Sequence, residues 1–238
     1  MRVRIRFTKL GRVRWTSHRD VARMWERALR RAAVPVAYSA GFSPRPQLSF
    51  GLALPTGCES VAEYLDVTVR ERVEPSGLAA TLGALLPEGV DVAGAAAVAP
   101  GAPSLQEAVS SCTWEIEVPG VETGALEAAV GRALDAAVLP VRRERKGREV
   151  VDDLRPSVHA LSCAGAGFGH RAGDVGARLL AELGTRPRGV RPSELATVMG
   201  VGFGLARRTS QWIERDGSRW EPLTVGSEAA AVPCERAS

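Results

Sequence analysis

The chain has 238 residues, of which 45% are hydrophobic, and its formal net charge is +4. This length suits one large domain or two small ones, because domains typically contain about 100 to 150 residues. The first fifty residues hold twelve Lys or Arg against two acids, a net charge of +10, so the rest of the chain sums to −6. Such an uneven field predicts a site for a polyanion, most often nucleic acid, although an acidic protein or an anionic membrane surface would also satisfy it.

Composition also argues against several classes of protein. The four cysteines lie too far apart to begin a zinc ribbon or an iron–sulfur motif, so free thiols are expected. No stretch of the sequence approaches the roughly 18 apolar residues of a membrane span, and the sequence opens without an apolar signal core. We therefore expect a cytoplasmic protein that does not enter a membrane and holds neither a metal ion nor a cofactor.

The first predicted element is a strand over residues 2–7, in which apolar and basic residues alternate. Alternation places the two kinds of side chain on opposite faces: Val3, Ile5 and Phe7 on one, Arg2, Arg4 and Arg6 on the other. If the apolar face packs on a core, the arginines form a cationic face that can contact phosphates.

A helix is predicted to begin after Ser17, a good N-cap residue, with Asp20 at the spacing of a capping box. It should end before Pro35. Apolar residues recur every three or four positions along it: Val21, Met24, Trp25, Ala28, Leu29 and Ala32. A separate stripe is basic: Arg19, Arg23, Arg27 and Arg30 or Arg31.

Further elements complete a small α+β unit. In chain order they are a short strand at 36–38, a turn-rich loop at 41–46, a period-two run at 48–54, a strand at 63–70, a helix at 75–86 and a strand at 90–98. The order strand, helix, strand, strand, helix, strand is the split β-α-β pattern of a ferredoxin-like domain.

A stretch rich in Pro and Gly at 99–104 precedes a second, similar series. This series comprises a strand at 113–118, a helix at 123–138, a hairpin of strands 141–145 and 148–153, a loop at 165–173, a strand at 175–183, a helix at 192–199 and a strand at 207–214. The expected fold is α+β, with two tandem ferredoxin-like halves whose antiparallel sheets carry helices on one face. The expected boundaries are a basic domain at 1–99, a linker at 100–111, a second domain at 112–221 and a disordered tail at 222–238.

Three segments of the basic half resemble one bacterial family: residues 16–20 (Thr-Ser-His-Arg-Asp), 25–32 (Trp-Glu-Arg-Ala-Leu-Arg-Arg-Ala) and 37–46 (Ala-Tyr-Ser-Ala-Gly-Phe-Ser-Pro-Arg-Pro). Shorter matches continue at 48–50, 57–60, 63–67 and 153–156. The family is a radical-SAM-associated domain of unknown function, found alone or fused to radical-SAM proteins with a cobalamin-binding-like region. The resemblance is strong over residues 3–70 and weak beyond about residue 160.

This resemblance implies a partner that carries an iron–sulfur cluster in a Cys-x-x-x-Cys-x-x-Cys motif, which this sequence lacks. The chain would then bind substrate for the radical-SAM enzyme or dock to it. Many enzymes of that superfamily modify RNA, so the resemblance implies a non-catalytic, RNA-binding companion of an RNA-modifying enzyme.

The predicted RNA contacts combine cations for phosphates with aromatic rings on which unpaired bases stack. The cations are Arg2, Arg4, Arg6, Lys9, Arg12, Arg14, Arg19, Arg23, Arg27 and Arg45, and the rings are Tyr38 and Phe42. Two other interpretations stay open: Tyr38 and Phe50 as core strand residues, and Phe42 as a plug that packs its loop onto the body. The predicted hairpin tip adds a second basic surface: Arg142, Arg143, Arg145, Lys146 and Arg148.

Two other functions remain open. The tandem topology and the glycine loops at 165–169 and 200–204 are faintly similar to CRISPR-type RNA endonucleases, which would make His18 a general base in a metal-independent nuclease. The acids Glu63 and Asp66 are interpreted as structural, because residues three apart in a strand face opposite ways. In the third alternative the basic face docks an acidic protein.

Overall fold

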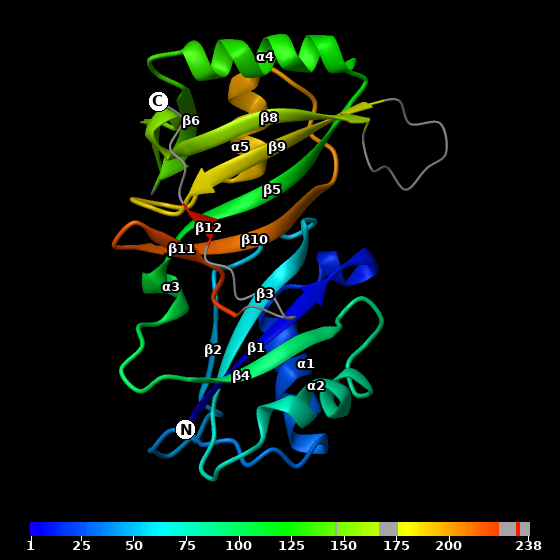
Figure 1. The fold of residues 1–238 in the computed structure, drawn as a ribbon, viewed down its shortest axis with the longest axis vertical. Coiled ribbons are helices and arrows are strands. Elements are labelled where there is room, and N and C mark those ends of the chain that lie inside the picture. The colour runs from blue at the N-terminus through cyan, green and yellow to red at the C-terminus, as the bar shows by residue number, and fades with distance from the viewer. Residues whose placement is uncertain (146, 167–175, 224–231, 234–238) are drawn as a thin grey trace. The chain divides into compact units, whose positions relative to one another are not determined.

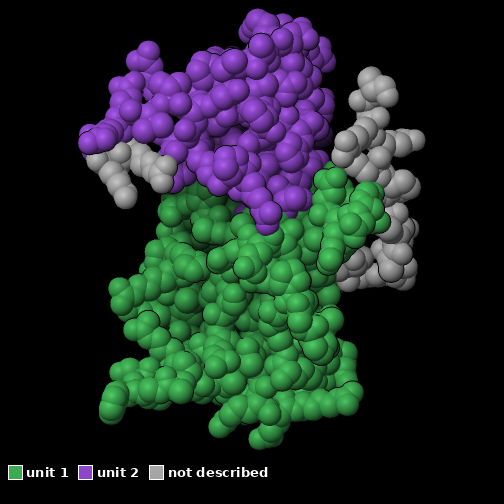
Figure 2. All heavy atoms as spheres, turned by 90° about the vertical axis from the view of Figure 1, so that its left-hand side faces the viewer, with its two compact units in different colours: residues 1–109, 211–238 green, residues 110–210 purple. Residues whose placement is uncertain are grey.

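The computed structural model describes residues 1–145, 147–166, 176–223 and 232–233. The chain divides into two compact units: unit 1 is Met1–Val109 with Gln211–Ser238, and unit 2 is Ser110–Ser210 (Figure 2). The segment after Ser210 therefore belongs with the N-terminal unit, whereas the sequence suggested a second domain that runs unbroken from 112 to 221. Gln211 shows why, because its side-chain amide donates to the Ala62 carbonyl at 2.6 Å and is fully buried in unit 1.

Unit 1 contains a sheet in the order β4-β1-β3-β2, in which neighbours are antiparallel (Figure 1). Its elements in the first part of the chain are β1 (Arg2–Lys9), the 3-10 helix η1 (Gly11–Trp15), α1 (His18–Arg31), β2 (Leu48–Phe50), β3 (Glu59–Thr68), α2 (Pro75–Gly83), β4 (Val92–Val98) and α3 (Leu105–Ala108). The end of the chain adds β11 (Ser218–Trp220) and β12 (Val232–Pro233).

The core of unit 1 forms between the apolar face of β1 and the apolar stripe of α1, as the two periodicities predict. Phe7 and Trp25 meet edge to face with ring centroids 4.9 Å apart, and Trp25 is fully buried. Leu82 of α2 joins the same core cluster. The predicted N-cap is confirmed, because the backbone N–H of Asp20 donates to Oγ of Ser17 at 3.2 Å.

The middle of unit 1 is less regular than the sequence suggested. The predicted strand at 36–38 is reduced to two isolated bridges, Val36 with Val69 and Tyr38 with Pro46. The predicted run at 48–54 forms strand only as far as Phe50. Beyond it, Gly51 still donates to the Tyr64 carbonyl at 2.9 Å, but the prolines at 44, 46 and 55 lack the N–H groups that a longer ladder needs.

Unit 2 has a sheet in the order β5-β9-β8, with the beginning of β10 hydrogen-bonded along β5. Its elements are β5 (Val109–Pro119), α4 (Thr123–Asp135), β6 (Pro140–Arg145), β7 (Arg148–Asp153), η2 (Arg155–Ser157), β8 (Val158–Ala166), β9 (Gly176–Gly184), α5 (Pro192–Met199) and the first half of β10 (Ala206–Arg215). The residues of β10 from Gln211 onward belong to unit 1. Two bonds place β10 beside β5: Glu117 N–H to the Leu205 carbonyl at 2.8 Å, and the Thr209 hydroxyl to the Thr113 carbonyl at 3.4 Å.

The predicted hairpin of unit 2 exists, but it is not part of the main sheet. Strands β6 and β7 form a separate two-stranded sheet, and β8, which the sequence did not predict, takes the place beside β9. Strand β8 was missed because its pairing is irregular, with register shifts between Val158 and Ala160 and between Cys163 and Ala166 that break the period of two. Most of the predicted loop at 165–173 lies outside the described residues.

The α+β class with mainly antiparallel strands is thus confirmed. None of the helices in the described part of the chain has the length and apolar character of a membrane span.

Candidate nucleic-acid interface

The three arginines of β1 form a face of the strand, as predicted, but their charges are engaged within unit 1. Arg4 is only 8% exposed and holds Asp66 with two hydrogen bonds, Nε to Oδ1 at 2.7 Å and Nη2 to Oδ2 at 2.8 Å. Arg2 donates to the Ala102 carbonyl at 2.6 Å. Arg6 forms an ion pair with Glu221 at 2.6 Å. This face is therefore internally paired rather than an open cationic surface.

The next basic residues along the chain are also partly engaged. Lys9 is 5% exposed, and its ammonium donates to the Thr16 carbonyl at 2.9 Å. Arg14 lies 3.4 Å from the buried carboxylate of Glu59 and stacks over Trp15, with 5.2 Å from its guanidinium carbon to the ring centroid. Arg12 is exposed. Of the three, Arg12 alone presents its guanidinium openly.

Helix α1 carries the arginines whose charge is open to solvent. All five on its polar stripe are exposed: Arg19, Arg23, Arg27, Arg30 and Arg31. Arg23 lies 3.5 Å from the exposed carboxylate of Asp20. The other four side chains make no hydrogen bond or ion pair with the residues that the structure describes. The exposed face of α1 is therefore the strongest candidate for a polyanion site.

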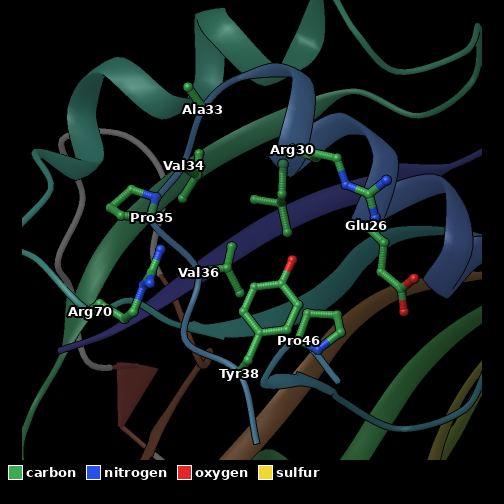
Figure 3. A pocket seen from close by; sticks show the side chains of 10 residues that line it. Glu26, Arg30, Ala33, Val34, Pro35, Val36, Tyr38, Pro46 and Arg70 are labelled. Carbon is green, nitrogen blue, oxygen red and sulfur yellow. The ribbon is translucent and has the colours of Figure 1, made fainter. Parts of the chain in front are cut away.

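Two depressions adjoin the C-terminal half of α1. One, which we call the Tyr38 pocket, has a volume of about 270 Å³ and is lined by Glu26, Leu29, Arg30, Ala33, Val34, Pro35, Val36, Tyr38, Pro46 and Arg70 (Figure 3). The other, the α1–α2 groove, has a volume of about 580 Å³ and is lined by Thr16, Asp20, Met24, Arg27, Ala28, Arg30, Arg31 and residues 84–87. Arg30 lines both depressions, so the same guanidinium borders the Tyr38 pocket and the α1–α2 groove.

The backbone fixes Tyr38 at the mouth of its pocket. On one side Ala37 donates to the Thr68 carbonyl at 2.8 Å, and on the other Ser39 donates to the Arg45 carbonyl at 2.8 Å. The Tyr38 side chain is 48% exposed, so the alternative interpretation of Tyr38 as a core residue is wrong. Phe42 is fully exposed, and the alternative in which it packs onto the body is also wrong.

Not all of the loop residues that were predicted to contact RNA line this pocket. Tyr38 lines the pocket, whereas Phe42 and Arg45 lie on the adjoining exposed loop. Sequence reasoning missed Glu26 and Arg70 as neighbours of Tyr38. Arg70 comes close because Val69 bridges to Val36 and the Arg70 N–H donates to the Pro35 carbonyl at 2.8 Å, contacts that no local pattern signals.

His18 lies apart from this pocket, at a much smaller cavity. Its ring meets Phe50 edge to face with centroids 5.1 Å apart. The cavity, about 20 Å³, is also lined by Lys9, Glu63 and Tyr64. That volume suits a single water molecule. His18, Lys9 and Glu63 thus line the same cavity.

Some arginines of the second basic surface lie close to acidic side chains. Arg142 lies 3.4 Å from Glu149, Arg143 forms an ion pair with Asp152, and Arg148 is exposed. Arg145 ends β6, and Lys146 lies outside the described residues. Asp152 also accepts from Nε of Arg188 at 2.9 Å. Hydrogen bonds from Arg143, and then from Arg188, lower the pKa of Asp152 below its ordinary value of 3.8.

The lowered pKa makes the contribution of Asp152 to stability dependent on pH. A carboxylate with a depressed pKa in the folded state stabilises the fold above its ordinary pKa, and this stabilisation is lost as the pH falls through the lowered pKa. We expect Asp152→Asn to lower the thermal unfolding midpoint at pH 7, with the deficit shrinking as the pH falls below about 3.8. Glu144→Gln, at an exposed position of the same hairpin, is the control. An equal deficit at pH 7 and at pH 3 would contradict the prediction.

Comparison with known proteins identifies a family over most of the chain. No curated protein matches the chain. Residues 2–190 match the family described as "Uncharacterized protein conserved in bacteria" (DUF2344), a range that contains both the α1 surface and the Tyr38 pocket. The chain therefore belongs to this bacterial family.

Proposed function

We propose that unit 1 binds RNA through the exposed face of α1, and that the chain presents this RNA to a radical-SAM enzyme that modifies it. One observation carries the proposal. Arg19, Arg27, Arg30 and Arg31 are exposed and have no acidic partner among the described residues, and all but Arg19 line one or both of the two depressions. Four open guanidinium groups on one helix offer repeated contacts to a phosphate backbone.

The fold that we infer for this role is a tandem of ferredoxin-like units. Its support is the order of the strands. Unit 1 reads β4-β1-β3-β2, and unit 2 repeats the order as β10-β5-β9-β8 if the β6–β7 hairpin is treated as an insertion after α4. In each unit the first strand leads into a helix, two further strands follow, and a second helix precedes the last strand.

The role of companion rests on the family resemblance of residues 3–70 rather than on the site geometry. The partner would supply the cluster and the radical chemistry. This chain would hold the RNA and orient it, work that needs positioned cations and an aromatic ring but no redox group.

Salt-dependent RNA binding tests the proposal. Fluorescence anisotropy with a labelled single-stranded RNA and a labelled hairpin should show binding at low salt. If the four open arginines of α1 contact phosphates, log K should fall against log salt with a slope of about −3 for a single strand. Absence of binding at low salt would reject RNA binding. Recovery of a radical-SAM protein on the immobilised chain, retained after RNase, would support the companion role.

A second candidate function is metal-independent RNA cleavage at His18. The observation that favours it is the small cavity where His18 lies with Lys9 and Glu63. The exposed His18 could take the proton of a 2′-hydroxyl as general base. Labelled RNA incubated in EDTA with the wild type and with His18→Ala tests this, and intact RNA in both samples would exclude it.

A further inference from the structure

We propose that the Tyr38 pocket binds one unpaired guanine of the RNA. This inference rests on the proposed function, in which the α1 face binds the RNA backbone, and it assigns to the neighbouring pocket the reading of a base. The two roles need different groups. Backbone binding needs only cations, whereas a base needs an apolar or aromatic surface and groups that match its edge.

The pocket has the size and walls for a single base. Its volume of about 270 Å³ lies just below the roughly 300 to 1,000 Å³ of typical sites for small ligands. The Tyr38 ring lies beside Pro46 and Val36, while Arg30 and Arg70 come from different sides of the pocket (Figure 3). A planar base can therefore stack on an aromatic ring with a guanidinium within reach at the rim.

The charged groups of the pocket select which base fits. Glu26 and Arg30 stand one turn apart on α1 and so project from the same side of the helix. Both line the pocket, and neither side chain has a hydrogen-bond or ion-pair partner among the residues that the structure describes. A carboxylate offers two acceptor oxygens side by side, and a guanidinium offers a fork of donors. The pocket thus presents an acceptor pair next to donors.

Guanine is the base that complements this pair best. Its N1–H and N2 amino group are adjacent donors that can meet both carboxylate oxygens of Glu26, and its O6 and N7 are acceptors of the kind that arginine binds with two bonds. Adenine and cytosine each offer a single amino group. Uracil has one N–H flanked by two carbonyl oxygens, which a carboxylate repels.

The same contacts require that the guanine is unpaired. The N1–H and amino group of guanine are used by cytosine in a duplex, so Glu26 can reach them only in a single strand, loop or bulge. Arg70, on the other side of the pocket, is placed to hold an adjoining phosphate. The bound group is therefore a guanosine nucleotide within single-stranded RNA.

The experiment compares two labelled RNAs of equal length, oligouridine and the same RNA with one central guanosine. The ratio of their affinities is measured by anisotropy at low salt, because the ratio cancels the general effect of charge. We expect the wild type to prefer the guanosine RNA about tenfold, the value of one good bidentate contact. Replacement of guanosine by inosine, which lacks the N2 amino group, should reduce the preference.

Variants of pocket residues test whether the pocket causes the preference for guanosine. Glu26→Gln and Tyr38→Ala should bring the ratio close to one, while Glu71→Gln, an exposed acid that does not line the pocket, should leave it unchanged. Equal affinity of the wild type for the two RNAs would overturn the guanine assignment and leave RNA binding intact. Failure of both RNAs to bind would overturn both proposals.

Discussion

Replacing Arg27, Arg30 and Arg31 together by glutamate should weaken RNA binding at least about a hundredfold. Each arginine is exposed, and each lines the α1–α2 groove, so the triple change reverses the charge of this groove without altering the core of unit 1. Hydrogen bonds to charged groups contribute about 1.5 to 3 kcal/mol each, and three phosphate contacts would be lost. The slope of log K against log salt should become shallower by about two, because fewer counterions are released.

Anisotropy with single-stranded RNA measures both effects. The matched control replaces Arg72, Arg132 and Arg215 by glutamate, since these arginines are also exposed and the change in total charge is the same. The control variant should keep most of its affinity. An equal loss in the two triple variants would show that total charge, rather than the face of α1, governs binding. Unchanged circular dichroism spectra would show that both variants fold.

The sequence was sufficient for features whose signal is local. Helix α1 could be placed from its N-cap at Ser17 and from apolar spacing that the buried Val21 and Trp25 confirm. Strand β1 followed from strict alternation. Both depend on residues within about a dozen positions of one another, where period and capping are decisive.

The sequence was insufficient where a partner lies far along the chain. The count of +10 treats all twelve cations alike, yet Arg4 is paired with an acid 62 positions away, and Arg14 and Arg6 with acids 45 and 215 positions away. The pattern of charges along the sequence contains no information on such pairs. They arise from the register of paired strands and from the return of the chain to unit 1 after Ser210. The open cations on α1 therefore had to be distinguished from paired ones by the fold.

The pairing of Arg4 leads to the second large effect, which is on stability. Asp66→Ala should destabilise unit 1 by about 3 to 5 kcal/mol, because it leaves the guanidinium of Arg4 buried without its carboxylate. Asp66 is 3% exposed and Arg4 8% exposed, so water cannot replace the lost partner fully. Arg2, with its Nε 3.7 Å from the same carboxylate, would lose a partner too. The free energy of unfolding in urea measures the change.

Replacing both members of the pair separates a structural role of Arg4 from a role in RNA binding. Arg4→Met with Asp66→Leu removes the buried charges together, so stability should return most of the way to that of the wild type. RNA affinity of this double variant should equal that of the wild type, because the positive charge removed is one that Asp66 already neutralises. A loss of RNA affinity comparable to that of the α1 triple variant would contradict this, and would mean that the β1 face releases Arg4 to bind phosphate.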